Sequence, residues 1–399
     1  MTLPGRWIQR IFFLFLSGIL PLSAQSPKAT AWADSLLKTM STDQKIGQLF
    51  MLTAYSNQDE SDYRFLQNLI ERYQPGGLIF MQGSPEKQIE LINRYQALSP
   101  TPLLIAQDAE WGLTMRLTGT QKYPRNMTLG AIQSDSLLYQ FGKQMAEELR
   151  RVGVQMNFAP VVDINNNPNN PVINDRSFGQ DKFNVTRKAY MTMKGMQDNG
   201  VMACAKHFPG HGDTGTDSHF DLPVLNHSLE RLDTLELYPF YRLMSSGVGS
   251  VMVGHLHVPA LDPTPNRSAS LSPLIVQTLM RDKLHYNGLI ITDALNMQGV
   301  TKYYGPGEVA LQALLAGNDI LLSPVNVPQS VEAISKALQS GVLAQQVLDE
   351  HVRRILIAKY GLGLKKWKPI PVDHARADVL TPKGEILRKQ LYENAITLA

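Results

Sequence analysis

Eight short apolar runs recur along the chain, and most of them are apolar at nearly every position. They lie at 47–52, 76–80, 102–107, 154–160, 201–207, 250–256, 288–294 and 319–324. Near-continuous apolarity is expected of parallel strands that are covered on both faces. Longer segments with a helical pattern separate or follow the runs, at 134–153, 272–288, 307–318 and 329–341. The first two begin at Ser and end at Gly, as helices often do.

Eight strands that alternate with helices predict an α/β fold, namely a (β/α)8 barrel over residues 30–365. The alternative is a doubly wound open sheet, but no Gly-rich phosphate-binding fingerprint follows an early run. In a barrel of parallel strands, all carboxyl ends open onto one face, where active residues gather. The polar residues at the ends of the runs are Asp108, Asp163, Lys206, His207, His255 and Asp293. The pattern therefore predicts one site at that face.

The N-terminus begins with a basic stretch, MTLPGRWIQR, followed by the apolar run IFFLFLSGILPL and then SAQ. This order is typical of a secretory signal peptide, here 1–24, and it predicts a secreted or periplasmic protein. A lasting membrane anchor is disfavoured because the apolar run is too short to span a bilayer. The formal net charge of +3 gives no reason to expect a nucleic acid partner. With one cysteine, Cys204, an intramolecular disulfide is excluded.

Residues 366–399 follow a different pattern. The stretch WKPIPVDHARADVL contains Pro and is irregular, PKGEILRKQLYENA has a helical pattern, and ITLA resembles the first residues of a strand. We interpret this region as a linker and the beginning of a second domain. The chain is then expected to be the N-terminal part of a longer protein.

The segment AKHFPGHGDTGTDSHFDLP, 205–223, holds three His, three Asp and one Lys among Gly and Pro residues that favour a loop. One interpretation is a metal-dependent hydrolase that uses His207, His211 and His219. A helix would place the first two on one face, but Pro209 and Gly210 lie between them and oppose a helix. Loop ligands remain possible under this interpretation.

The other interpretation of the loop is acid/base chemistry on a substrate. Asp217 is close enough in sequence to His219 to fix its tautomer and to stabilise its protonated form. Such an imidazole can give a proton to a leaving group and later take one from water. Asp293, at the end of another run, can serve as a nucleophilic carboxylate. These three residues are a plausible set for glycoside hydrolysis, although most such enzymes use two carboxylates.

The segment KHFPGHGDTGTDSH resembles the motif of glycoside hydrolase family 3, in its β-N-acetylglucosaminidase branch. Three further segments are similar to the family: AQDAEWGLTMR, NPNNPVINDRSFG and GLIITDALNMQG. The resemblance covers roughly residues 40–365. The segment at 107–112 departs from it, because Ala109 and Trp111 stand where many relatives have Gln or His, and Gly.

The resemblance assigns roles position by position. It implies that Asp293 is the nucleophile, that His219 is the general acid/base and that Asp217 is the partner of His219. It implies substrate contacts for Asp108, Arg116, Arg176, Lys206 and His207. Taken alone, each arginine is equally well explained as part of a structural ion pair.

The activity implied by the resemblance is that of a retaining exo-β-N-acetylhexosaminidase. It would remove terminal N-acetylglucosamine from peptidoglycan fragments or chitin oligosaccharides, with a carbohydrate as its partner and with neither metal nor cofactor. A β-glucosidase or an N-acetylglucosaminide phosphorylase on the same barrel remains an alternative. A metal-dependent hydrolase and a non-catalytic sugar-binding barrel remain alternatives from other classes. The oligomeric state stays open.

Five further residues have weaker indications. We expect Asp163 to order the Asn-rich loop NNNPNN, and we expect His211 to order its own loop. His255 is a candidate for the pocket wall. Met297 and Trp111 are either core residues or parts of the pocket, where the Trp could stack on a sugar ring.

Overall fold

The computed structural model describes residues 26–218 and 220–397. Eight parallel strands form one sheet in the order β7-β6-β5-β4-β3-β2-β1-β8. A bridge between Ile291 and Ile320, with a 3.1 Å hydrogen bond from the Thr292 amide to the Ile320 carbonyl, closes the ring between β7 and β8. The predicted (β/α)8 barrel is therefore confirmed. The strands are β1 (Phe50–Ala54), β2 (Gly77–Phe80), β3 (Leu104–Gln107), β4 (Met156–Asn157), β5 (Met202–Phe208), β6 (Ser250–Val253), β7 (Leu289–Thr292) and β8 (Leu321–Leu322).

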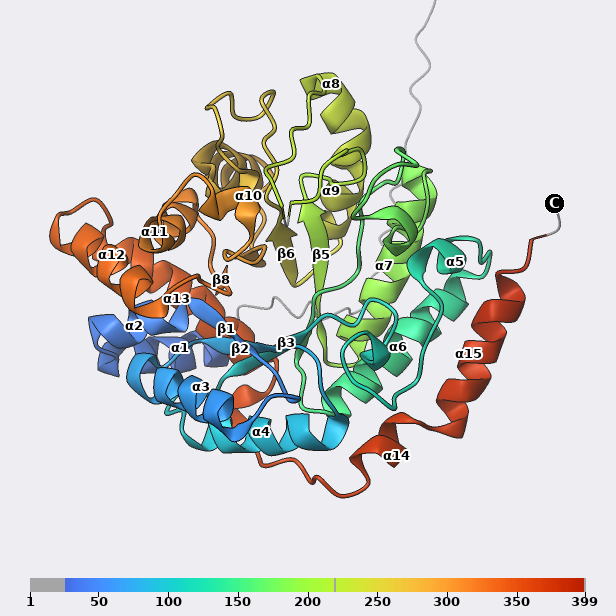
Figure 1. Cartoon of the computed structure of the whole chain (residues 1–399), viewed down its shortest axis with the longest axis horizontal. Coiled ribbons are helices and arrows are strands. Elements are labelled where there is room, and N and C mark those ends of the chain that lie inside the picture. The colour runs from blue at the N-terminus through green and yellow to red at the C-terminus, as the bar shows by residue number, and fades with distance from the viewer. Residues whose placement is uncertain (1–25, 219, 398–399) are drawn as a thin grey trace, which may run out of the picture.

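Helices surround the ring of strands (Figure 1). All residues of β2, β3, β6 and β7 are buried, which explains why their sequences are apolar without alternation. The helices of the described residues are α1 (Pro27–Thr39), α2 (Thr42–Gln48), α3 (Glu60–Tyr73), α4 (Pro85–Ala97), α5 (Asn126–Gly130), α6 (Asp135–Arg151), α7 (Lys182–Asp198), α8 (Leu229–Arg231), α9 (Tyr238–Ser245), α10 (Gln298–Thr301), α11 (Pro306–Ala316), α12 (Val327–Gln339), α13 (Gln345–Gly361), α14 (Ala375–Val379) and α15 (Pro382–Asn394). The 3₁₀ helices are η1 (Leu113–Met115), η2 (Asn174–Arg176), η4 (Ala269–Leu271) and η6 (Leu364–Lys366). The π-helices are η3 (Leu232–Glu236) and η5 (Leu274–Lys283).

The helical patterns in the sequence correspond to α6, η5, α11 and α12, and η5 is a π-helix rather than an α-helix. Helix α11 ends at Gly317, whose φ of 109° suits a residue without a side chain. The fourth strand is shorter than the run at 154–160. Pro160 lacks an amide hydrogen and cannot donate to a ladder, so regular pairing ends before it.

The C-terminal segment packs along the outside of the barrel. It runs past α4 and α6, where α15 lies beside α6 (Figure 1). Arg151 Nε donates to Asp378 at 2.7 Å, and Arg376 binds Glu86 through two 3.1 Å bonds. The predicted helix in this segment is confirmed as α15, while the proposed second domain stays a prediction.

The predicted signal peptide lies outside the described residues. None of the described helices is long and apolar enough to cross a membrane.

A buried carboxyl lies between α6 and this segment. Glu148 Oε1 accepts from the Tyr123 hydroxyl at 2.6 Å and from Gln144 Nε2 at 3.0 Å, while its other oxygen has no partner. Burial raises the pKa of Glu148 from 4.5 to about 7. The protonated form is therefore the one that the fold favours.

Glu148→Gln is expected to remove a pH dependence of stability. A carboxyl with a raised folded-state pKa contributes fully below its unfolded pKa, and the contribution is lost as pH rises through the folded pKa. For the wild type this loss is about 2 to 3 kcal/mol between pH 5 and pH 8. Gln copies the neutral form of the carboxyl. In urea unfolding, the free energy of unfolding of the variant relative to the wild type should therefore be higher at pH 8 than at pH 5. Glu147→Gln, at the exposed neighbouring residue, is the control, and equal pH profiles for wild type and Glu148→Gln would contradict this account.

Candidate active site

A cavity of about 460 Å³ lies at the carboxyl ends of the strands. Six of the predicted site residues line it, namely Asp108, Arg116, Arg176, Lys206, His207 and Asp293. Asp108 and Asp293 directly follow β3 and β7, Lys206 and His207 lie near the carboxyl end of β5, and Arg116 and Arg176 lie on the loops after β3 and β4. The strand-end rule therefore places them together. Asp217 is half-buried and is not among the lining residues, and His219 lies outside the described residues.

A network of five charged side chains covers one side of this cavity. Lys206 Nζ lies 2.8 Å from Asp108 Oδ1 and 2.9 Å from Glu110 Oε1. Arg116 binds the other oxygen of Asp108. Arg176 donates from Nη2 and Nε to the two oxygens of Glu110, at 2.7 and 3.0 Å. The network joins the loops after β3 and β4 to the end of β5.

Opposite charges in this network keep Asp108, Glu110, Arg176 and Lys206 ionised. Burial raises the pKa of Glu110, but Arg176 and Lys206 outweigh it and hold the pKa well below its usual range. Burial lowers the pKa of Lys206, and Asp108 and Glu110 together raise it above its usual value. Glu110 is not among the site residues predicted from the sequence, yet it bridges two of them. Its place in AQDAEWG, two residues after Asp108, is the only signal for it in the sequence.

Asp163 fixes the backbone at the end of β5. Its carboxylate accepts from the amides of His207 and His211, the latter at 2.7 Å, and contacts His207 Nδ1 at 2.8 Å. The expectation that Asp163 orders the Asn-rich loop is therefore wrong, because its side chain points to β5 instead. Asn170 orders that loop, since it donates to the His211 carbonyl at 2.7 Å and accepts from the Val172 amide at 2.9 Å.

Asp293 follows β7 and is partly exposed to the cavity. Its Oδ1 accepts from the Ala294 amide at 2.8 Å. Burial raises the pKa of Asp293, but His255, His207 and that amide bond outweigh burial and lower it. His255 itself is fully buried behind the cavity wall, where Nε2 donates to the Ala294 carbonyl at 2.9 Å. His255 therefore supports the Asp293 segment and does not line the pocket as expected.

The loop that follows β5 is packed closely against its neighbours. His211 Nδ1 lies 2.6 Å from Thr214 Oγ1, and its Nε2 lies 3.3 Å from Ser218 Oγ. Burial lowers the pKa of His211 to about 4, so the ring is neutral at pH 7 and orders the loop, as expected. A Cβ at Gly212 would lie 1.8 Å from the Ile164 carbonyl oxygen, so this position requires glycine.

The described histidines do not favour the metal interpretation. His207 Nδ1 is taken by Asp163, and its Nε2 faces the Arg176 guanidinium at 3.4 Å, which is an unfavourable neighbour for a cation. The one group of potential ligands within the described ranges is Asp213, His227 and Glu236. The Arg231 guanidinium already lies 3.3 Å from Asp213 and 3.1 Å from Glu236, so both carboxylates of that group already face a cation.

Trp111 and Met297 both line the cavity. The Arg125 guanidinium lies 4.1 Å from the centre of the Trp111 ring and also binds Asp175 at 3.0 Å. One face of Trp111 is thus covered by a cation, which fixes the ring. Trp111 belongs to the pocket wall and not to the core.

The chain matches the model of the glycosyl hydrolase family 3 N-terminal domain over residues 41–358. It is 32% identical to β-hexosaminidase A of Pseudoalteromonas piscicida over 371 residues, which are 82% of this chain and 62% of that protein. Among solved structures it is similar to a family 3 β-N-acetylglucosaminidase from Paenibacillus sp. str. FPU-7, with a TM-score of 0.84 and 36% identity over 90% of this chain and 70% of the other.

A second solved structure is also similar. It is the β-glucoside phosphorylase BglX bound to 2FGlc, with a TM-score of 0.89 and 27% identity over 95% of this chain and 69% of that one. In the first comparison, the chain spans 62% of the length of β-hexosaminidase A of Pseudoalteromonas piscicida. The family model, however, covers most of the barrel, including the ends of strands β1 to β8. The chain therefore belongs to glycoside hydrolase family 3.

Proposed function

We propose that this protein is a retaining exo-glycosidase that removes terminal β-linked N-acetylglucosamine from peptidoglycan fragments or chitin-type oligosaccharides. The observation that supports it most strongly is the ionised carboxylate of Asp293, which faces the cavity. The network of five charged side chains covers another side of the same cavity. The relatives named above, a β-hexosaminidase and a β-N-acetylglucosaminidase, support the preference for the 2-acetamido group. The sequence of the N-terminus supports export to the periplasm or the medium.

The proposed reaction has two steps. In the first, Asp293 attacks the anomeric carbon, the bond to the leaving-group oxygen breaks, and His219 gives that oxygen a proton. In the second, a water attacks the same carbon, His219 takes its proton, and the bond to Asp293 breaks. Asp108 and Lys206 hold the sugar hydroxyls, since one accepts and the other donates hydrogen bonds.

The charge of the cavity favours hydrolysis over transfer to phosphate, the reaction named for one structural relative. Its described lining holds three carboxylates, Asp108, Glu110 and Asp293, and three cations, Arg116, Arg176 and Lys206. Each of the three cations already pairs with a carboxylate. A neutral sugar fits this balance, whereas a phosphate dianion finds no cation among these described residues that lacks a counter-charge.

A panel of aryl glycosides tests the function. We expect turnover of the N-acetyl-β-glucosaminide, at least tenfold slower turnover of the β-glucoside, and no rise in either rate when phosphate replaces an inert buffer. A preference for the glucoside would favour the β-glucosidase alternative. Appearance of a sugar phosphate would favour the phosphorylase, and loss of turnover with a chelator would favour the metal-dependent hydrolase.

His219→Ala is expected to affect poor leaving groups most. A general acid matters when the departing oxygen is strongly basic, as in a second sugar, and matters little for nitrophenolate. We expect the chitobiose rate to fall about 10²- to 10⁴-fold and the nitrophenyl rate to fall far less. Asp217→Ala should show the same ordering with smaller losses, because it only orients the ring. Equal losses for both leaving groups would assign His219 to binding or loop structure instead.

A further inference from the structure

The outer wall of the barrel carries a hollow of about 270 Å³ between α7 and α9, which pack beside each other (Figure 1). Its lining includes three aromatic rings, two arginines and a serine, namely Phe183, Tyr190, Tyr238, Arg187, Arg242 and Ser246. We infer that this α7–α9 hollow binds a sugar unit that carries a carboxylate, within a longer acidic glycan. The assignment concerns binding only and is independent of the proposed function.

The α7–α9 hollow is separate from the catalytic cavity, because the two share no described lining residue. Helices α7 and α9 follow β4 and β5, so each begins on the side of the strand carboxyl ends and runs back along the outside of the barrel. Phe183 and Tyr238 lie in the first turns of these helices. A ligand in the hollow therefore contacts the outer wall and leaves the catalytic cavity open.

Phe183 and Tyr238 form a fixed aromatic platform in the hollow. Their ring centres lie 5.4 Å apart, with the ring planes at 78°. Lys182 Nζ lies 5.2 and 5.0 Å from the two ring centres and donates to the Thr234 carbonyl at 2.6 Å, which holds the ammonium beside the rings. Phe183 nonetheless remains 60% exposed. A fixed aromatic face of this kind packs on the apolar face of a sugar ring with little loss of conformational entropy.

The charge of the hollow is positive, since its described lining holds two arginines and no carboxylate. Arg187 shares Asp135 with Lys188, at distances of 3.3 and 3.1 Å from the carboxylate. Arg242 is exposed and takes part in no ion pair within the described ranges. The planar guanidinium binds a carboxylate through two parallel hydrogen bonds, so Arg242 is suited to an anionic group on a ligand.

Size and chemistry restrict the ligand. The hollow is smaller than the roughly 300 to 1,000 Å³ of pockets that enclose a whole small molecule, so it fits one unit of a longer chain. The hydroxyls of Tyr190 and Ser246 are able to exchange hydrogen bonds with those of a sugar. A neutral sugar would leave Arg242 unused, and an inorganic anion would leave the aromatic platform unused. A carboxylated sugar engages both.

A titration with trigalacturonate tests the assignment. Each ring of this trimer carries a carboxylate, the trimer contains no N-acetylglucosamine, and the Nε–H NMR signals of the arginines report where it binds. We expect a saturable shift of the Arg242 signal, which is identified by its absence in Arg242→Gln. The methyl ester of the same trimer keeps the sugar rings and lacks the charges, so its affinity should be at least about tenfold lower.

Two substitutions test the two parts of the hollow, and the Arg187 signal follows binding in both variants. Arg242→Gln and Phe183→Ala should each weaken the binding of trigalacturonate about fivefold, because one removes the partner of the carboxylate and the other removes the stacking face. Both side chains are exposed, so the fold should be unaffected. Arg242→Lys keeps the charge without the planar fork and should recover part of the affinity.

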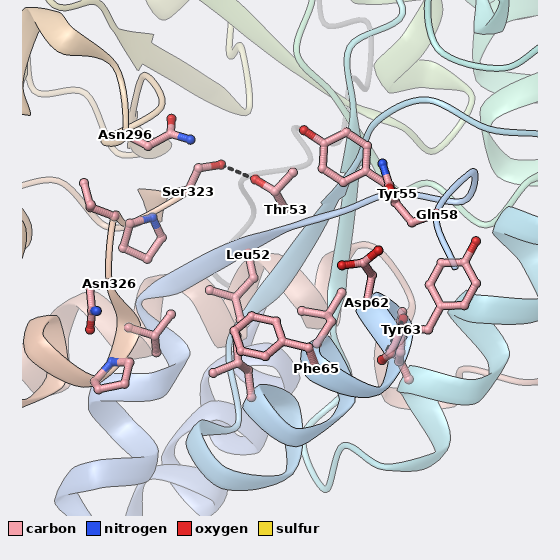
Figure 2. A pocket seen from close by; sticks show the side chains of 17 residues that line it. Leu52, Thr53, Tyr55, Gln58, Asp62, Tyr63, Phe65, Asn296, Ser323 and Asn326 are labelled. Carbon is pink, nitrogen blue, oxygen red and sulfur yellow. Dashed lines mark hydrogen bonds between the residues drawn. The ribbon is translucent and has the colours of Figure 1, made fainter. Parts of the chain in front are cut away.

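Arg72→Gln and Phe65→Ala are the matched controls. Arg72 is exposed and lies 5.1 Å from the centre of the Tyr73 ring, but it does not line the α7–α9 hollow. Phe65 is 65% exposed and lines a different hollow, beside α3, where Asp62 is the one charged residue among the described lining (Figure 2). Both variants should bind trigalacturonate within about twofold of the wild type.

Four results would contradict the inference. Equal affinity for the trimer and its methyl ester would show that the charge is not recognised. Displacement of the trimer by inorganic phosphate at the same concentration would show that the sugar is not recognised. Competitive inhibition of aryl glycoside turnover would place the trimer in the catalytic cavity. A changed mass of Phe183→Ala in sedimentation, with unchanged binding of the trimer, would assign the hollow to contact with a second copy of the chain. A failure of the proposed function would leave the titration unaffected, because the titration measures binding without turnover.

Discussion

Asp293→Ala is expected to lower turnover of an aryl N-acetyl-β-glucosaminide by roughly 10⁴-fold, because it removes the carboxylate that we propose as the nucleophile. The fold should be unaffected. The carboxylate follows β7 and faces the cavity, and within the described residues it accepts a hydrogen bond from the Ala294 amide beside it. Thermal unfolding of the variant should therefore overlay that of the wild type within about 1 kcal/mol.

A fluorinated glycoside that stops the reaction at the intermediate provides the second measurement. Mass spectrometry of the digested wild type should place the sugar on the peptide that contains Asp293. Asp293→Ala should acquire no label. Labelling of another carboxylate, or turnover by the variant at more than about a tenth of the wild-type rate, would reject this nucleophile.

Glu110→Ala should be costly for stability and activity together. Glu110 is 2% exposed and accepts from Arg176 at both oxygens while also pairing with Lys206. Removal of one partner from a buried ion pair leaves the cations uncompensated, at a cost of about 3 to 5 kcal/mol. Arg176 and Lys206 would also lose their positions, so kcat/KM should fall at least about 10²-fold. Urea unfolding and steady-state kinetics measure the two effects.

Glu86→Ala is the matched control for this prediction. Glu86 also binds an arginine with two hydrogen bonds, to Arg376, but that pair lies on the surface. An exposed ion pair contributes about 0 to 1 kcal/mol, so its loss should be small in both assays. If the two glutamate variants lose equal stability, burial is not the reason for the importance of Glu110.

The fold could be predicted from the sequence because parallel strands covered on both faces leave a simple trace, namely eight apolar runs separated by segments with a helical pattern. The trace is less reliable for strand length. The run at 154–160 predicts a longer strand than Met156–Asn157, since apolar residues such as Phe158 and Ala159 stay buried after the strand ends at Asn157. Burial, and not pairing, is what the apolar pattern reports.

The site could be predicted only in part, for a related reason. Strand ends are visible in the sequence, so Asp108, Lys206 and Asp293 could be placed on one face. Partners that come from distant segments could not be predicted. Glu110 binds Arg176, which lies 66 positions further along the chain, and Asp163 reaches the end of β5. The hollow of about 790 Å³ beside the cavity has no local pattern in the sequence either, because α3 and the loop after β8 form it together.

The two sides of the barrel mouth differ in how freely their residues can be exchanged during evolution. On the side of the charged network, Lys206 serves two carboxylates and Glu110 serves two cations, so a substitution at one position needs compensation at others. On the side of α3, side chains such as Phe65 and Asp62 project separately from one helix (Figure 2). Single substitutions are therefore more easily accepted on the α3 side than within the charged network.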